Sequence, residues 1–266
     1  MIDNPRSPRV RAVAKLAKKD GRQESGRFLL EGPQAVGEAL EFRPELLADV
    51  YATKSALDRH PELARAAKSA RVAIDTVTEK VLEAMADTVT PQGVVAVAEQ
   101  FPVSLDDIAA AGPALVAILE EIRDPGNAGT ILRAADAAGA DGVMFTGKSV
   151  DPYNPKVVRS TTGSLFHLPH AVVPTLAEAV GAMREAGLQV LAADVTGEDL
   201  LEARAEGILG RPTAWVFGNE AHGLDADRLA LADRVLRLPI YGAAESLNLA
   251  TAASVCLYES AFAQRA

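Results

Sequence analysis

Apolar positions along this chain follow two patterns, and each predicts a different kind of element. Short, nearly continuous apolar runs predict buried strands, and the run at 114–119 (ALVAIL) fits a central strand of a parallel sheet. Apolar residues spaced three and four positions apart predict helices, as at 131–138 (ILRAADAA). Because the two patterns alternate through the second half, they predict an α/β fold with a parallel, doubly wound sheet.

The first hundred residues carry a smaller series of the same patterns. A helix is predicted at 8–20, and Gly21 is its expected end. Strands are predicted at 27–31, 46–51, 72–74 and 93–98, with helices between them. These short pieces predict a small α/β domain that is separate from the second half.

The composition changes at 99–113, where prolines and glycine bracket a polar, alanine-rich stretch. This change predicts a boundary between two domains. The predicted parts are an amino-terminal domain at 1–100, a linker at 101–113 and a second domain at 114–266.

Polar residues follow the predicted strand WVF, where Gly218, Asn219 and Glu220 come next. Because the carboxyl ends of parallel strands meet at one edge of a sheet, this arrangement predicts a site there. An unpaired buried carboxylate is costly, so Glu220 needs a partner, and Arg133 is the cation expected at the same edge. The alternative for Arg133 is an ion pair with Asp136 one turn along its own helix.

The turn DPGNAGT, at 124–130, joins the first strand of the second domain to its helix. Backbone N–H groups at the start of this helix could bind an anion, or Gly126 and Gly129 could simply permit a tight turn. The turn is neither G-x-G-x-x-G nor a Walker loop, so its support for a nucleotide site is weak. A dinucleotide-binding oxidoreductase is therefore an alternative that lacks its full fingerprint.

Composition excludes several classes of protein. An apolar fraction of 48% supports a packed core, yet no apolar run approaches the roughly 18 residues of a membrane helix. No signal peptide is visible and a single cysteine fits a reducing compartment, so we expect a cytoplasmic protein without membrane contact. That cysteine, Cys256, lies among apolar residues, which predicts a buried side chain rather than a catalytic thiol. The four histidines lack metal-ligand spacing, so no metal site is predicted.

The formal net charge of −9 argues against indiscriminate binding to nucleic acid. The first thirty residues are nevertheless rich in basic side chains, namely Arg6, Arg9, Arg11, Lys15, Lys18, Lys19, Arg22 and Arg27. These side chains could bind phosphates, or they could form a solvated helix face, and charge alone leaves both interpretations open.

Three segments of the second domain together resemble a known family. DPGNAGTILRAADAAGADGV, VFGNEAHGL and LPIYGAAESLNLATAASVCLYE are similar, in order and spacing, to three successive motifs of the SpoU/TrmH family. Its members are RNA ribose 2′-O-methyltransferases of the SPOUT superfamily, and the resemblance covers 115–262. The first hundred residues, with RFLLEGPQAVGEAL, resemble the family's amino-terminal RNA-binding domain, which is like a small ribosomal protein.

The resemblance implies a fold that periodicity does not predict: a parallel-sheet methyltransferase domain whose carboxyl-terminal chain forms a trefoil knot and which assembles as a homodimer. It also implies that S-adenosylmethionine supplies a methyl group to a ribose 2′-hydroxyl of RNA, above all ribosomal RNA, without a metal. Methylation of transfer RNA is one alternative. The other is an RNA-binding protein that has lost catalysis, although the residues whose loss would favour it, Arg133 and the loop Ser246-Leu247-Asn248, are all present.

The same resemblance assigns roles to single residues. The catalytic and substrate positions are Arg133, Asn127, Glu220, Ser246 and Asn248, and the cofactor positions are Gly218, Leu238, Ile240 and Leu247. In this family the position of Arg133 is often assigned to removal of the 2′-hydroxyl proton. Since a guanidinium normally stays charged, Arg133 could instead clamp the adjacent phosphate and stabilise the developing alkoxide, with Glu220 orienting it. Asn219 and His222 occupy variable places of the second motif.

The last predicted helix, 247–262, carries a broad stripe of small and apolar side chains: Leu249, Ala250, Ala253, Ser254, Leu257, Tyr258 and Ala261. Such a stripe must be buried against another surface. The domain's own sheet could cover it, but the resemblance points to a partner subunit. We therefore expect a symmetric dimer whose interface adjoins both active sites.

Overall fold

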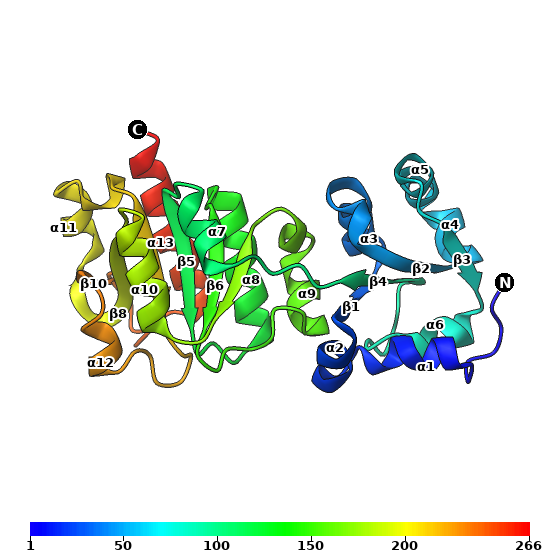
Figure 1. Ribbon diagram of the computed structural model, residues 1–266. Helices are drawn as coiled ribbons and strands as arrows, with labels where there is room; N and C mark the ends of the chain where they lie inside the picture. Colours follow the sequence, from blue (N-terminus) through cyan, green and yellow to red (C-terminus); the bar gives the residue numbers. More distant parts are fainter. The chain divides into compact units, whose positions relative to one another are not determined.

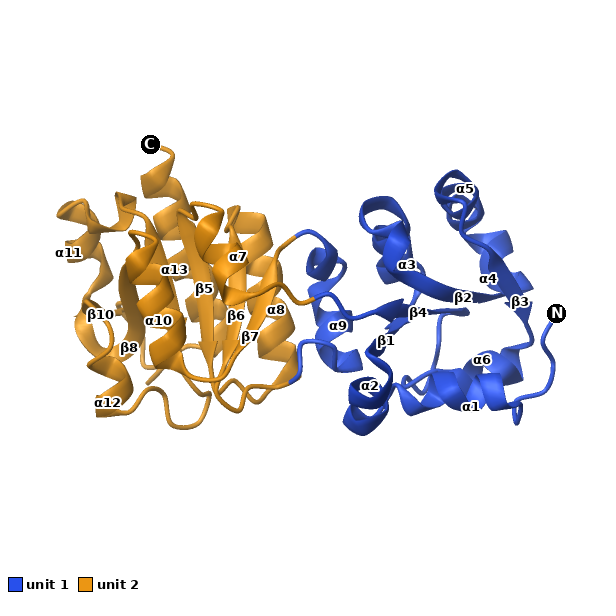
Figure 2. Cartoon of the chain, viewed as in Figure 1, with its two compact units in different colours: residues 1–101, 151–167 blue, residues 102–150, 168–266 orange.

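The computed structural model describes residues 1–266, which form two compact units (Figure 2). The first unit contains residues 1–101 together with 151–167, and the second contains 102–150 and 168–266. The chain therefore passes between the units three times, and the sequence boundary at 101–113 accounts for only one of these passages.

The first unit is built on a four-stranded mixed sheet in the order β1-β4-β2-β3 (Figure 1). The second strand in this order is antiparallel to both of its neighbours, and the last two strands are parallel. The strands are β1 (Arg27–Glu31), β2 (Leu47–Thr53), β3 (Ile74–Val77) and β4 (Val94–Glu99). The helices are α1 (Pro8–Lys15), α2 (Lys19–Ser25), α3 (Pro33–Phe42), α4 (Lys54–Arg59), α5 (Pro61–Ala70), α6 (Glu79–Met85) and α9 (Pro155–Thr161), with 3-10 turns η1 (Pro44–Leu46) and η2 (Ser164–Phe166).

The predicted helix at 8–20 is wrong in its extent. The first helix ends at Lys15, and Gly21 lies inside α2 rather than at a helix end. A Cβ atom at Gly21 would overlap the carbonyl oxygen of Lys15, so glycine is needed there for close approach of the two segments. The residue that ends α2 is Gly26, at φ 66°.

The second unit is built on a six-stranded parallel sheet in the order β10-β8-β9-β5-β6-β7. This confirms the parallel α/β sheet that strand and helix alternation predicts. The strands are β5 (Leu115–Glu120), β6 (Gly142–Thr146), β7 (His170–Val173), β8 (Gln189–Asp199), β9 (Thr213–Phe217) and β10 (Arg234–Arg237). The helices are α7 (Leu105–Ala110), α8 (Pro125–Ala138), α10 (Leu176–Glu185), α11 (Leu200–Ala205), α12 (Ala226–Leu229) and α13 (Leu249–Gln264), with the 3-10 turn η3 (Ile208–Gly210).

Helices cover both faces of this sheet (Figure 1). On one face α7 and α10 pack on alternate residues of the central strands, such as Val116 and Ile118. On the other face α8 and α13 pack against each other, and Trp215 of β9 donates a hydrogen bond of 2.9 Å from Nε1 to Ser260 of α13. Every residue of β5 is buried, as its continuous apolar run predicts.

Two segments differ from the predicted domain limits. The expected linker contains α7, which begins with a capping box between Ser104 and Asp107 and buries Ile108 in the core of the second unit. Residues 151–167, expected in the second domain, pack within the first unit, where the Tyr153 and Phe28 rings lie 4.8 Å apart. The composition of 101–113 is that of a polar linker, but the capping box and the burial of Ile108 stabilise a helix there.

Four of the seven residues in the predicted stripe on α13 are buried within this chain, whereas Tyr258 is exposed. Ala250, Ala253, Leu257 and Ala261 are at most 4% exposed, because α8 and the sheet cover them. Another face of the same helix exposes Val255, Tyr258 and Phe262. None of the helices combines the length and the apolar composition that a bilayer span requires.

Candidate functional site

A cavity of about 470 Å³ lies where β8, the loop after β9 and the loop between β10 and α13 come together. Its volume falls within the range of small-molecule sites in proteins. Eight of the nine site residues expected from the sequence line it: Asn127, Gly218, Glu220, Leu238, Ile240, Ser246, Leu247 and Asn248. Arg133, the ninth, is not among its lining residues and is exposed on α8. The roles of these residues stay predictions.

The loop after β9 is tightly folded, because glycines allow it to close on itself. A Cβ atom at Gly218 would lie 2.7 Å from the carbonyl carbon of Gly223, so no other residue fits without a shift. Asn219 and Gly223 form an isolated antiparallel bridge, and Gly223 has φ 63°. The loop therefore presents its polar groups in a fixed turn at the carboxyl end of a buried strand.

Glu220 is held by the turn between β5 and α8. Its carboxylate accepts hydrogen bonds from the backbone N–H groups of Arg123 (3.1 Å) and Asp124 (3.0 Å) and from the side-chain amide of Asn127 (3.3 Å). The predicted pairing of Glu220 with Arg133 is therefore wrong. Peptide N–H groups at the start of α8 take the place of the expected cation, as the dipole of a helix amino terminus favours.

Asn127 links the first and third motif segments of the chain. Its side-chain oxygen accepts a hydrogen bond of 3.0 Å from Asn248 Nδ2, while its own amide donates to Glu220. Asn248 in turn caps α13, because its Oδ1 accepts from the N–H of Thr251. Three loops that are distant in sequence are thus joined through the side chains of Glu220, Asn127 and Asn248.

The remaining lining of the cavity combines apolar side chains with few charges. Leu236, Leu238, Ile240 and Leu247 supply apolar surface, and Gly218 lines the cavity beside them. A flat, apolar adenine ring and a chain of polar groups suit such a lining. The lining of the cavity therefore fits S-adenosylmethionine, the cofactor that the resemblance implies.

Asp194 is a lining residue that the sequence reasoning missed. It lies in β8, and its Oδ1 accepts hydrogen bonds from both the N–H and the hydroxyl of Thr196. The sequence contains a pattern that could have identified Asp194, because this polar residue comes soon after the apolar run at 190–192, as Glu220 does after WVF. Only the strand order reveals that β8 and β9 are neighbours.

Cys256 does not line this cavity. Cys256 is 1% exposed, and burial raises the pKa of its thiol to about 12. Because the thiolate is the reactive form, a thiol with this pKa stays inert at neutral pH. His222 lines the cavity, but no group of three or more His, Cys, Asp or Glu side chains in residues 1–266 could hold a metal ion.

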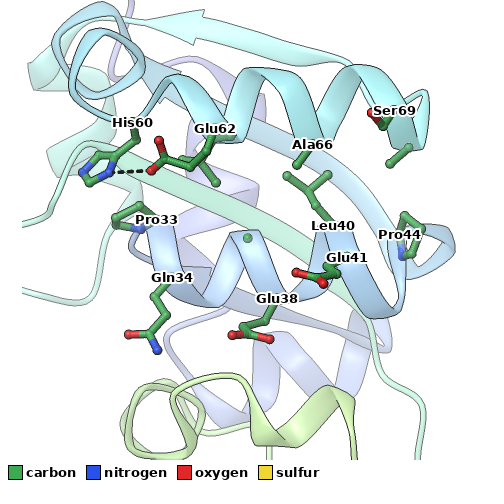
Figure 3. Close-up of a pocket in the computed structure, with 13 residues that line it drawn as sticks. Pro33, Gln34, Glu38, Leu40, Glu41, Pro44, His60, Glu62, Ala66 and Ser69 are labelled. Carbon is green, nitrogen blue, oxygen red and sulfur yellow. Dashed lines mark hydrogen bonds and ion pairs between the residues drawn. The ribbon is translucent and has the colours of Figure 1, made fainter.

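The first unit has a cavity of its own, about 760 Å³ in volume, between α3 and α5 (Figure 3). Glu38, Glu41 and Glu62 line it, and His60 contacts Glu62 at 3.1 Å. Carboxylates of this kind repel phosphate groups. It also contains none of the nine site residues expected from the sequence, so we place the candidate site in the second unit.

Two family models match the chain one after the other. The model of the SpoU rRNA Methylase family matches residues 114–258. The model described as RNA 2'-O ribose methyltransferase substrate binding matches residues 29–103.

Curated relatives match almost the whole chain. A protein of Synechocystis named as an uncharacterized tRNA/rRNA methyltransferase is 35% identical, over 97% of this chain and 92% of its own length. The 23S rRNA (uridine(2479)-2'-O)-methyltransferase of Streptomyces viridochromogenes is 34% identical, over 93% of this chain and 86% of its own. The 23S rRNA (guanosine(2553)-2'-O)-methyltransferase of Bacillus subtilis is 30% identical, over 97% of each chain.

Solved structures of similar chains contain the expected cofactor. The SpoU methyltransferase AviRb from Streptomyces viridochromogenes, in complex with AdoMet, superimposes with a TM-score of 0.81 at 31% identity, covering 97% of this chain and 99% of that one. An AdoMet-bound rRNA methyltransferase from Sinorhizobium meliloti gives 0.80 at 30% identity, covering 97% and 96%.

Proposed function

The chain belongs to the SpoU rRNA methylase family, and from this premise we propose that it transfers a methyl group from S-adenosylmethionine to a ribose 2′-hydroxyl of ribosomal RNA. The observation that carries the proposal is the cavity in which residues of all three motif segments meet. Relatives named as 23S rRNA 2′-O-methyltransferases match nearly the full chain, which favours ribosomal over transfer RNA. A dinucleotide-binding oxidoreductase has no comparable support.

The reaction makes limited demands on this protein. When bound, S-adenosylmethionine supplies an electrophilic methyl group on a sulfonium sulfur, so no metal is needed to activate it. The protein must hold the ribose oxygen in line with that methyl group and stabilise the negative charge that develops as the 2′-hydroxyl loses its proton. Water must also be excluded from the reacting atoms.

We assign these tasks to the residues of the candidate site. Gly218, Leu238, Ile240 and Leu247 bind the cofactor through backbone groups and apolar contact. Ser246 contacts the ribose, and the bonded chain of Glu220, Asn127 and Asn248 fixes the loops around it. Arg133 binds the phosphate next to the target nucleotide and stabilises the developing alkoxide, while the 2′-hydroxyl proton passes to water and the methyl–sulfur bond breaks.

Three further features belong to the proposal. The carboxyl-terminal chain forms a trefoil knot, two subunits form a symmetric dimer, and the first unit binds RNA in the cytoplasm. The match of residues 29–103 to a substrate-binding model supports the role of the first unit, and the exposed apolar face of α13 supports the dimer.

Two measurements test the proposed function. Calorimetry with S-adenosylmethionine should detect binding to the purified chain, and nicotinamide dinucleotides should not bind. Ribose-methylation mapping of ribosomal RNA from cells with and without the gene should reveal a 2′-O-methyl group that depends on it. An unchanged map in ribosomal RNA, with a lost modification in transfer RNA, would redirect the proposal to the other substrate.

A further inference from the structure

A second cavity, of about 830 Å³, adjoins the candidate cofactor cavity within the second unit. Both cavities are lined by the loop 219–223, so Glu220 borders each of them. The remaining walls come from α12 and from the turn between β5 and α8. A ligand in this second cavity therefore lies directly beside the loop at which methyl transfer is proposed.

Most polar side chains in this second cavity already have partners inside the protein. Glu120 is 3% exposed, accepts a hydrogen bond of 2.5 Å from Thr146 and pairs with Arg228 at 2.6 Å. Asp124 and Asp225 cap α8 and α12 by accepting from backbone N–H groups. These groups shape the walls and have little capacity left for a ligand.

Three side chains in the cavity remain available for hydrogen bonding to a ligand: Arg123, Glu121 and His222. Arg123 is exposed, and its bond to Glu220 uses only its backbone N–H. The carboxylate of Glu121 makes one long contact, 3.6 Å to Arg228, which is beyond hydrogen-bonding distance. The cavity thus offers a forked donor and a carboxylate acceptor two residues apart in sequence.

The backbone at Glu121 is unusual for a residue with a long side chain. Its φ is 53°, in the left-handed region that glycine and asparagine adopt with less strain. The N–H of Glu121 donates to Thr146 O and its carbonyl accepts from Asn219 Nδ2 at 2.8 Å, which fixes this conformation. A carboxylate side chain held at a strained position beside a site is typical of a functional residue.

The charge of the cavity indicates what kind of ligand fits. Its carboxylates outnumber its arginines, with Glu120, Glu121, Asp124, Glu220 and Asp225 against Arg123 and Arg228. A phosphate would be repelled, whereas an uncharged nucleobase can donate and accept hydrogen bonds along one edge. Among the four RNA bases, only guanine presents two adjacent N–H donors, N1–H and N2–H, beside the acceptor O6.

Building on the proposed function, we propose that this second cavity receives the base of the target nucleotide after it is turned out of the RNA stack, and that it selects guanine. The carboxylate of Glu121 accepts from N1–H and N2–H, and the guanidinium of Arg123 donates to O6. The ribose of that nucleotide lies at the loop 219–223, where the two cavities meet.

The test uses the full chain, S-adenosylmethionine and an unmodified transcript of 23S rRNA. Nucleoside analysis of the digested product should identify 2′-O-methylguanosine. Glu121→Gln preserves side-chain size but turns one acceptor oxygen into a donor, so kcat/KM for the transcript should fall at least tenfold while the Kd for the cofactor changes less than twofold. Asp227→Asn, on the exposed part of α12, is the matched control and should keep wild-type values.

Glu121→Asn is a second variant that suits the left-handed backbone, so it should fold and show the same loss. A methylated nucleoside other than 2′-O-methylguanosine, or wild-type kcat/KM in both Glu121 variants, overturns the guanine cavity and leaves the methyltransferase proposal standing. If the wild-type chain itself yields no 2′-O-methylated nucleoside, the proposed function fails with it, and the two failures are distinguishable.

Discussion

At the scale of single residues, hydrogen bonds from uncharged donors, namely peptide N–H groups and side-chain amides, hold the candidate site together. Glu220 is oriented by two peptide N–H groups and one amide, none of which titrates. Arg133 is exposed and forms no hydrogen bond that holds the fold. The residue expected to act on the substrate is therefore separate from those that build the loops.

Replacement of Arg133 should separate catalysis from cofactor binding. Arg133→Ala removes an exposed cation that does not line the cofactor cavity, so methyl transfer should be abolished while the Kd for S-adenosylmethionine stays nearly unchanged. Arg133→Lys keeps the charge but loses the planar fork, and should recover only part of the activity. Calorimetry that found cofactor affinity falling in parallel with turnover would contradict this division of roles.

Asn248 should distinguish a structural role from a functional one. Asn248→Asp keeps the oxygen that caps α13, so the free energy of unfolding should stay close to that of the wild type. It removes the N–H donor to Asn127, which should lower turnover at least tenfold. Asn248→Ala loses the cap as well and should cost about 1 kcal/mol of stability. Equal stability losses in both variants, measured by denaturant unfolding, would show that the cap is not what Asn248 contributes.

The sequence located this site well but misassigned one of its contacts. Motif resemblance named eight of the residues that line the cavity, and their roles stay predictions. It failed for the partner of Glu220, since an acceptor for backbone N–H groups leaves no mark in the sequence. Asp194 was missed because strand order, which makes β8 a neighbour of β9, depends on long-range pairing.

At the scale of elements, local patterns predicted most helices and strands, and the exceptions have physical causes. Gly21 looked like a helix end but serves close packing inside α2. The stretch at 101–113 looked like a linker, yet a capping box and a single buried isoleucine are enough to make α7. A fragment that starts at Ala114 would lose α7 and keep residues 151–167 without their partners, so we do not expect it to fold.

Residues 151–167 pack within the first unit, and removal of the ion pair between Arg22 and Asp151 tests how much this packing stabilises the fold. Arg22 is 2% exposed and lies 2.7 Å from Asp151, and it also donates to the carbonyls of Leu16 and Ala17. Arg22→Ala leaves the carboxylate and both carbonyls without this partner, so the free energy of unfolding should fall by about 3 kcal/mol. Lys19→Ala, on the exposed side of the same helix, should change it by less than about 0.5 kcal/mol. A small effect at Arg22, measured by denaturant unfolding, would mean that solvent replaces the lost contacts.

At the scale of the whole molecule, the structure narrows which basic residues can meet RNA. Arg9 pairs with Asp49 and Asp75, Arg22 is buried, and Arg27 pairs with Glu99, so these three are engaged in the fold. The other basic side chains of the first thirty residues are exposed: Arg6, Arg11, Lys15, Lys18 and Lys19. Within this leading segment, we therefore expect a phosphate-binding face to use this second group.

Charge reversal at Lys15, Lys18 and Lys19 should weaken RNA binding and flatten its dependence on salt. Each lost phosphate contact lowers the slope of log K against log salt by about 0.7 to 0.9, so three contacts lower it by about 2 to 3. Reversal at Lys54, Lys68 and Lys80, exposed lysines of the same unit, changes net charge equally and should leave the slope nearly unchanged. Equal effects of the two triple variants would assign the binding to net charge rather than to a face.

The burial of α13 determines which substitutions can test whether two subunits form a dimer. Ala253 and Leu257 lie in the chain's own core at 0% exposure, so a glutamate there would unfold the subunit and could not report on a dimer. Three other apolar side chains of this helix are exposed: Val255 by 39%, Tyr258 by 36% and Phe262 by 58%. Their spacing places them on one side of the helix, and the rings of Tyr258 and Phe262 lie 5.6 Å apart.

These three residues are the apolar surface that a second subunit would cover. The first turn of the same helix reaches the cofactor cavity through Leu249 and Ala252, so a dimer interface on α13 would adjoin the active site. The double variant Tyr258→Glu, Phe262→Glu should sediment as a folded monomer with little activity, while Glu202→Lys on exposed α11 should remain dimeric. A wild-type chain that sediments as a monomer at low micromolar concentration with full turnover would remove the dimer from the mechanism.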